Sequence, residues 1–245
     1  MNEQNKGSEK EFFDRFDEEG GYERFDQRGY DRLLSEFARL VAPRSGELIV
    51  DLGCGSGAFT AQLQRRFPDC RMTGLDLSEG CVKRAKAEHP DIVFKVADAE
   101  ATGLSAASVD AVSFSGVLHH FPDFSKVAAE AFRLLKPGGR FFSYDPHHLN
   151  PAFWLYRAKS SPFYSPIGVT TNERLLTKTE VVRVFSGAGF SAAARIISGV
   201  TFTYVESGRV RPLLGIYNTL DRALGATPLA SWLGAWVIGS GVKPG

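Results

Sequence analysis

Three carboxylates, those of Asp51, Asp76 and Asp98, each stand at or near the end of a short apolar segment of this 245-residue chain. A glycine-rich turn, residues 53–57, follows the first of them, and a helix-forming stretch, residues 57–67, follows the turn. An apolar segment, a tight turn and a helix in this order predict a buried strand that leads to the free N–H groups of a helix N-terminus. The pattern therefore predicts a binding site for a small polar cofactor.

The glycine turn by itself fits two kinds of cofactor. Gly53, Gly55 and Ala58 match the G-x-G-x-x-G/A pattern of dinucleotide-binding proteins. Asp51, however, places a negative charge where a pyrophosphate would be repelled and an ammonium group attracted. Gly57 is a third flexible position that the dinucleotide turn does not need. Because glycine costs conformational entropy, three glycines without a packing reason favour close approach of a ligand to the backbone.

Two further segments of the sequence distinguish between these two kinds of cofactor. Residues 118–121 read LHHF and residues 134–140 read LLKPGGR, and their distances from the glycine turn are more specific than the turn alone. Together the three segments resemble the class I methyltransferases that use S-adenosylmethionine (SAM), in the ubiquinone/menaquinone-biosynthesis-type branch (methyltransferase domain 11/25-like). The resemblance is close over about residues 48–145, and weak before residue 40 and beyond residue 150.

The resemblance implies a set of contacts with SAM. Asp76 would accept hydrogen bonds from both ribose hydroxyls, each worth about 1.5–3 kcal/mol, a device that NAD enzymes share. Asp98 would meet the adenine amino group and the N–H of Ala99 the ring, while Leu77 would cover the adenine face. Cys54 is expected to be a small neighbour of the cofactor and not a nucleophile. The implied cofactor-binding residues are Asp51, Gly53, Cys54, Gly55, Gly57, Asp76, Leu77, Asp98, Ala99 and Ser115.

Two adjacent histidines, His119 and His120, follow the fourth expected strand, close to the implied sulfonium. Methyl transfer is a direct displacement at carbon, so positioning the acceptor and excluding water can lower the barrier by roughly 7–11 kcal/mol. His120 is the candidate general base, worth about 10²–10⁴-fold, and a structural role in the cofactor loop is the alternative. Asp145, His147 and His148 could contact substrate or a metal, or form a hydrogen-bonded loop, and no metal is expected.

Strands and helices alternate from residue 48 to residue 145, which predicts an α/β fold with a parallel sheet and right-handed crossovers. With the resemblance, this becomes a doubly wound, seven-stranded, mostly parallel sheet of the Rossmann-like methyltransferase type, with an antiparallel last strand. That last strand is either 201–205 or 235–242, and its Lys-Pro end favours the second range. Ligands of such sheets bind at the carboxyl ends of the strands.

The expected organisation is an N-terminal helical cap, residues 1–42, and a methyltransferase domain, residues 43–245. Helical lid insertions over the cofactor cleft are expected at about 147–177 and 199–233, where the β/α pattern breaks. Residues 1 to about 10 are expected to be disordered. The aromatic and charged residues 11–28 either lie over the cofactor or pack on the edge of the sheet.

Composition excludes several classes of protein. A net charge of +1 without a basic stripe argues against a nucleic-acid surface. The three cysteines lack metal-ligand spacing, which indicates free thiols and a cytoplasmic location. Residues 229–239 are too short to span a bilayer, although Trp232 and Trp236 leave peripheral membrane contact open beside core packing. The oligomeric state is open.

The leading hypothesis is a SAM-dependent methyltransferase that acts on a small or lipid-like acceptor, because the insertions are aromatic and apolar. An NAD-dependent oxidoreductase is the first alternative, disfavoured by Asp51 and by the lack of a Tyr-x-x-x-Lys pair after the fourth strand. A nucleic-acid methyltransferase would need an Asn/Asp-Pro-Pro-aromatic turn where residues 115–118 read SGVL. A non-catalytic SAM-binding protein stays open, as do the acceptor and its reacting atom.

Overall fold

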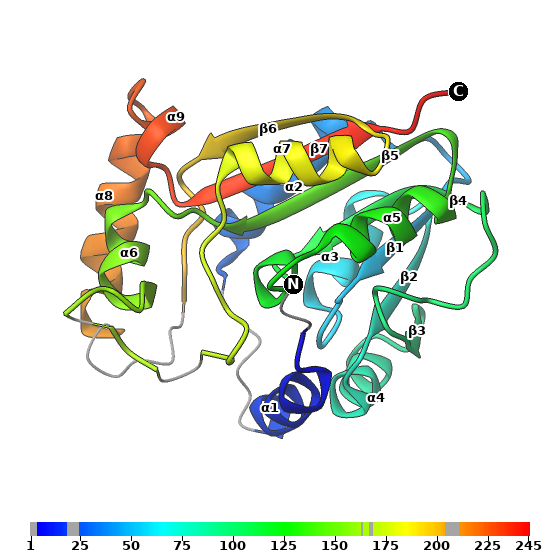
Figure 1. Ribbon diagram of the computed structural model, residues 1–245, viewed down its shortest axis with the longest axis horizontal. Coiled ribbons are helices and arrows are strands. Elements are labelled where there is room, and N and C mark those ends of the chain that lie inside the picture. Colours follow the sequence, from blue (N-terminus) through cyan, green and yellow to red (C-terminus); the bar gives the residue numbers. More distant parts are fainter. Residues whose placement is uncertain (1–3, 19–24, 163, 167–168, 204–210) are drawn as a thin grey trace.

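A seven-stranded sheet in the order β3-β2-β1-β4-β5-β7-β6 forms the centre of the computed structural model (Figure 1), which describes residues 4–18, 25–162, 164–166, 169–203 and 211–245. Strands β1 to β5 pair in parallel, and β7 is antiparallel to both β5 and β6. The predicted fold class is therefore confirmed. The strands are β1 (Leu48–Leu52), β2 (Arg71–Asp76), β3 (Val93–Val96), β4 (Val109–Ser115), β5 (Leu135–Pro146), β6 (Ser191–Ile197) and β7 (Trp236–Val242).

Helices cover both faces of the sheet, as the alternating pattern predicts. The α-helices are α1 (Lys6–Glu18), α2 (Gln27–Val41), α3 (Ala58–Arg66), α4 (Glu79–Glu88), α5 (Ser125–Leu134), α6 (Pro151–Arg157), α7 (Lys178–Gly187), α8 (Leu214–Gly225) and α9 (Ala230–Leu233). Helices α2 and α3 pack on one face of the sheet and α5 and α7 on the other (Figure 1). The described residues include no helix that is both long and apolar enough to cross a bilayer.

The central strands are apolar on both faces because each face is covered. Ile49 and Val50 of β1 point to opposite sides, so the first joins the core under α2 and α3 and the second the core under α5 and α7. In the latter core the rings of Phe141 and Phe185 stack with centroids 3.9 Å apart. This burial fixes the register of the sheet and thereby the positions of the strand ends that carry the polar residues.

Helix α1 corrects the expectation for the N-terminus. Residues 1–10 were expected to be disordered, but a helix begins at Lys6 and packs against α4 (Figure 1). The helix is held by polar contacts to distant segments, which its own composition does not reveal. Residues 1–3 lie outside the described part of the chain.

The last strand is 235–242, as its Lys-Pro end favoured. It forms β7 (Trp236–Val242), whereas in the range 201–205 Phe202 makes one isolated bridge to Phe25 and residues 204 and 205 lie outside the described part. Lys243, directly after β7, donates to the carbonyls of Phe132 and Leu135 at 2.7 and 2.8 Å. This lysine thus satisfies free carbonyls at the C-terminal end of α5.

Candidate active site

The glycine turn has the conformation that its residues predict. Gly53, Gly55 and Gly57 have φ angles of +72°, +53° and +81°, in the region that side chains disfavour. A Cβ on Gly53 would lie 2.3 Å from Cγ2 of Val117, and one on Gly57 would lie 2.6 Å from Cζ of Phe94. These two glycines therefore do have a packing reason, which corrects the expectation that only a ligand explains them.

We expect Gly53→Ala to cost more than its backbone strain. Gly46 has a similar φ angle of +80° and open space around its Cα, so Gly46→Ala measures the strain alone, about 1–2 kcal/mol. Gly53→Ala adds the overlap with Val117 and should cost about 2 kcal/mol more in the free energy of unfolding. Urea unfolding of the two variants tests the difference. The double variant Gly53→Ala/Val117→Ala should recover most of it, and equal costs for the two single variants would contradict the clash.

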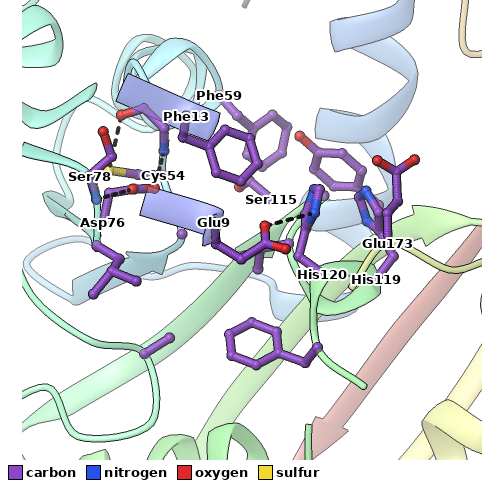
Figure 2. Close-up of a pocket in the computed structure, with 18 of the residues that line it drawn as sticks. Glu9, Phe13, Cys54, Phe59, Asp76, Ser78, Ser115, His119, His120 and Glu173 are labelled. Carbon is purple, nitrogen blue, oxygen red and sulfur yellow. Dashed lines mark hydrogen bonds and ion pairs between the residues drawn. The ribbon is translucent and has the colours of Figure 1, made fainter. Parts of the chain in front are cut away.

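Asp76 ties the glycine turn to the start of α4. One carboxylate oxygen accepts from the N–H of Gly55 at 2.8 Å, and the other accepts from the N–H of Ser78 at 2.9 Å (Figure 2). Burial raises the pKa of the Asp76 carboxyl, and the two N–H groups oppose that rise. Asp76 lines a cavity that also has Gly53, Cys54 and Gly55 in its wall.

Asp51 and Gly57 are the two predicted site residues that lie outside this wall. Asp51 is buried, and its two oxygens accept from the hydroxyls of Thr60 at 2.7 Å and Ser115 at 2.6 Å. Ser115 does line the cavity. Asp51 therefore does not contact the cavity directly but lies behind Ser115, whose hydroxyl donates to it.

Burial raises the pKa of Asp51 to about 6, from 3.8. The folded protein thus keeps a proton that the unfolded chain releases between about pH 4 and 6, so the wild type loses about 3 kcal/mol of stability as the pH rises through that window. We expect Asp51→Asn to lack this loss. Urea unfolding of both proteins at about pH 4 and about pH 7 measures this loss. If the free energies of unfolding of the two proteins differ by the same amount at both pH values, the shifted pKa is contradicted.

Leu77, Asp98 and Ala99, which the resemblance places around the adenine, line the cavity. Lys6 of α1 forms ion pairs with both Asp98 and Glu100. Asp98 therefore has a hydrogen-bond donor from α1 beside it.

Helix α1 forms part of the wall as well. Glu9, Lys10 and Phe13 face the cavity, and Asp14 accepts hydrogen bonds from the hydroxyl of Ser78 and the N–H of Gly80 at the start of α4. Of residues 11–28 the structure describes 11–18 and 25–28, and Phe13 and Phe25 from these two parts line the cavity. Residues 19–24 lie outside the description.

The cavity continues past Ser115 into a chamber with an aromatic wall. Its aromatic side chains come from several segments of the chain: Phe25, Tyr30, Phe59, Tyr144, Phe153, Phe202 and Trp236. The segments expected as lids contribute Phe153, Arg157 and Glu173 from 147–177 and Phe202 from 199–233. The aromatic part of this wall suits contact with an apolar or planar part of a ligand.

Both histidines lie in the wall of this chamber (Figure 2), and each has a carboxylate near its Nδ1 atom. Nδ1 of His119 lies 2.9 Å from Oδ1 of the fully buried Asp145, which also accepts from the backbone N–H of His119. Nδ1 of His120 lies 3.1 Å from the hydroxyl of Thr170 and 3.4 Å from Oε2 of Glu9. His119 is thus held by the sheet and His120 by α1.

His119, His120 and Glu173 also form the one group of described residues with metal-ligand character. Their ligand atoms lie within 4.8 Å of one another. Arg157 lies 3.6 Å from the Glu173 carboxylate and competes with a cation for it. His147, the other candidate, points away from the chamber and bonds the carbonyl of Gly234 at 3.0 Å.

Sequence reasoning missed Glu9, Lys6, Glu173 and Arg157. Lys6 and Glu9 belong to a segment that reads as disordered, and Glu173 and Arg157 belong to a segment without periodicity. The aromatic residues of the second segment were the available signal there, whereas residues 1–10 contain charged residues and no aromatic one. Cys54 lies in the cavity wall, and burial raises the pKa of its thiol, which does not favour a nucleophile.

Comparison with known proteins gives matches over the sheet. A family described as a methyltransferase domain (Methyltransf_11) matches residues 50–143. Trans-aconitate 2-methyltransferase of Methylobacterium radiotolerans is 39% identical over 132 residues, which are 53% of this chain and 49% of that protein. The ubiquinone/menaquinone biosynthesis C-methyltransferase UbiE of Rubrivivax gelatinosus is 34% identical over 140 residues, 57% and 52% of the two chains. The chain thus spans about half the length of these curated relatives.

A solved structure with a similar fold covers nearly the whole chain. Phosphoethanolamine N-methyltransferase 2 of Haemonchus contortus, in complex with phosphomonomethylethanolamine and S-adenosylhomocysteine, has a TM-score of 0.67 at 18% identity, over 96% of this chain and 60% of that one. The likeness confirms the fold. The matched residues 50–143 contain the glycine turn, Asp76, Asp98 and both histidines, so this part of the chain is similar to a methyltransferase domain of the Methyltransf_11 type.

Proposed function

We propose that the chain transfers the methyl group of SAM to a small or lipid-like acceptor by in-line displacement. One observation carries this proposal: a single cavity joins the glycine turn, Asp76 and Asp98 at one end to an aromatic chamber with two histidines at the other. The first end has the groups that an adenosyl amino acid needs. The second end offers space for an acceptor beside them.

In the proposed complex the glycine turn holds the amino-acid part of SAM, with Cys54 beside it. Ser115, whose hydroxyl donates to Asp51, would hold the ammonium group. Asp76 would accept from the ribose hydroxyls while it keeps the N–H groups of Gly55 and Ser78, since each carboxylate oxygen has two lone pairs.

Asp98 takes the adenine amino group in this complex, between Leu77 and Ala99. Gly57 contributes by allowing the turn into α3, because a side chain there would overlap Phe94. The cap, residues 1–42, and the two insertions, 147–177 and 199–233, close the chamber around the acceptor. Their role is to exclude water and to hold the acceptor in line with the methyl group.

One of the two histidines serves as the general base. The sequence predicted His120, and the geometry favours His119. Asp145 accepts from Nδ1 of His119, which leaves Nε2 as the atom that can take a proton, in the arrangement of a carboxylate–histidine pair. Asp145 is fully buried, which raises the pKa of its carboxyl, and its Oδ2 has no hydrogen-bond partner among the described residues. A protonated His119 would stabilise the ionised form of this carboxyl.

Two measurements test the proposed function. Titration calorimetry should show binding of SAM and no binding of NAD, and binding of NAD alone would support the oxidoreductase instead. Incubation with SAM and a panel of small phenols, amines and quinols should release S-adenosylhomocysteine. Binding of SAM without turnover of any acceptor in the panel would favour the non-catalytic alternative.

A further inference from the structure

Helix α8 exposes a row of apolar side chains, although Leu214 and Tyr217 on its inner side already pack against the core. Leu213, directly before α8, and Ile216 and Leu220 within it are spaced three and four residues apart, so they share one helical face. The side chains of Ile216 and Leu220 are 61% and 64% exposed. Single exposed apolar residues are common, but a contiguous stripe of them is typical of an interaction surface.

The opposite side of α8 is anchored by polar contacts. The side-chain amide of Asn218 exchanges two hydrogen bonds with the backbone of Phe202, at 2.8 and 3.0 Å. Asp221 is buried and accepts from the N–H of Gly199 at 2.6 Å. These contacts fix the orientation of the helix, so the apolar stripe cannot turn inward without leaving buried polar groups unpaired.

Neighbouring helices extend the stripe. Trp232 of α9 is 72% exposed, and Trp154 and Leu155 of α6 are exposed as well. Helix α6 is tied to α9 by the bond from Asn150 to the carbonyl of Leu233, and to α8 by contact between the rings of Phe153 and Tyr217. Figure 1 shows α6, α8 and α9 together at one end of the molecule, away from α4 and β3. We call these exposed residues of α6, α8 and α9, with Leu213, the apolar end.

Charge indicates what covers this end. Within residues 211–235 the exposed charged side chains are Arg211 and Arg222, and the one acid of that range, Asp221, is buried. Apolar and aromatic residues flanked by arginines, with no exposed acid between them, suit the boundary between acyl chains and anionic headgroups.

The apolar end is also the outer side of the acceptor chamber. Phe153 lies on the inner side of α6 and lines the cavity, whereas Trp154 and Leu155 of the same helix face outward. Trp236, directly after the α9 segment, lines the cavity as well. Helix α6 therefore has side chains both on the chamber and on the exposed surface.

We propose that the apolar end binds peripherally to anionic lipid bilayers. The helices lie in the plane of the headgroups, with Ile216, Leu220 and Trp232 in the acyl boundary and Arg222 at the phosphates. The binding rests on the apolar end alone. Its use in delivering a lipid-like acceptor to the chamber rests on the proposed function.

Flotation of the full chain with vesicles tests the proposal. We expect binding to phosphatidylcholine vesicles that contain phosphatidylglycerol, and weaker binding to phosphatidylcholine alone. Ile216→Ser/Leu220→Ser should weaken the binding at least about tenfold, because two apolar side chains no longer leave water. Arg222→Gln should weaken it about fivefold, in anionic vesicles only. The matched control is Val93→Ser/Val96→Ser, which removes two exposed apolar residues of β3 and should leave the binding unchanged.

The outcomes separate the alternatives. Unchanged binding of the Ile216→Ser/Leu220→Ser variant, or no binding of the wild type, would overturn the proposal. A wild type that is dimeric in sedimentation, and a variant that is monomeric, would assign the apolar end to a second copy of the chain. Calorimetry with SAM shows whether each variant is folded, because none of the substituted residues lines the cavity. If the wild type does not bind SAM, that result counts against the proposed function and not against the lipid binding.

Discussion

His119→Gln slows methylation of a protonated acceptor by about 10²–10⁴-fold, the usual contribution of a positioned general base. In the proposed step Nε2 of His119 takes the proton of the acceptor hydroxyl, the oxygen bonds to the methyl carbon, and the electron pair of the breaking C–S bond goes to sulfur. Glutamine cannot take that proton. Asp145→Asn should have a similar effect, because an amide can turn the imidazole to the wrong tautomer.

The measurement compares two acceptors. Hydroquinone is protonated at neutral pH, whereas 4-nitrophenol ionises readily and needs little help. We expect His119→Gln to lower the hydroquinone rate far more than the 4-nitrophenol rate, and the deficit to shrink as the pH rises. His120→Gln is the matched control, since its loss loosens α1 but leaves the ratio of the two rates unchanged. If only His120→Gln changes the ratio of the two rates, His120 is the general base, as the sequence predicted.

Asp76→Ala weakens the affinity for S-adenosylhomocysteine by about 10²–10³-fold, or about 3–4 kcal/mol. The variant loses the bonds to the ribose hydroxyls, and it also releases the N–H groups of Gly55 and Ser78, which Asp76 holds at 2.8 and 2.9 Å. Titration calorimetry measures the affinity. Asp91→Ala, which removes an exposed acid near β3, is the control and should bind as the wild type does.

An Asp76→Ala variant that binds S-adenosylhomocysteine with undiminished affinity would remove the basis of the proposed cofactor site. Asp76→Asn refines the result. Its amide oxygen can still accept from one of the two N–H groups, so an intermediate affinity is expected. Urea unfolding of each variant separates lost binding from lost folding.

The parts of the fold that follow from local pattern were predictable. Strands β1 to β5 and their helices come from apolar segments that alternate with capped helices, and Ser78 begins α4 by accepting from the N–H of Cys81 at 3.0 Å. The last strand was recognisable from its alternating pattern and its Lys-Pro end. The structure adds that a Cβ on Gly239 or Gly241 would overlap neighbours in the sheet. Within the site, the wall residues from Gly53 to Ala99 follow from the same strand ends.

The parts that depend on distant contacts were not predictable. Lys6 pairs with Asp98 from 92 positions away, and no local pattern of α1 reveals that partner. The pairing of His119 with Asp145 depends on the register of β4 against β5, which includes a shift between Val109 and Ala111. A cytoplasmic location and the boundary of the N-terminal cap stay predictions.

The packing of α1 on the adenine side of the cavity has a kinetic consequence. A bound nucleoside can leave on that side only when Lys6 separates from Asp98 and Glu100, and Asp14 from Ser78. These charges are partly exposed, so dissolved ions screen their attraction within about 10 Å at 0.1 M. Added salt should therefore shorten the residence time of S-adenosylhomocysteine. If release of this product limits the rate, turnover should be faster at high salt than in dilute buffer.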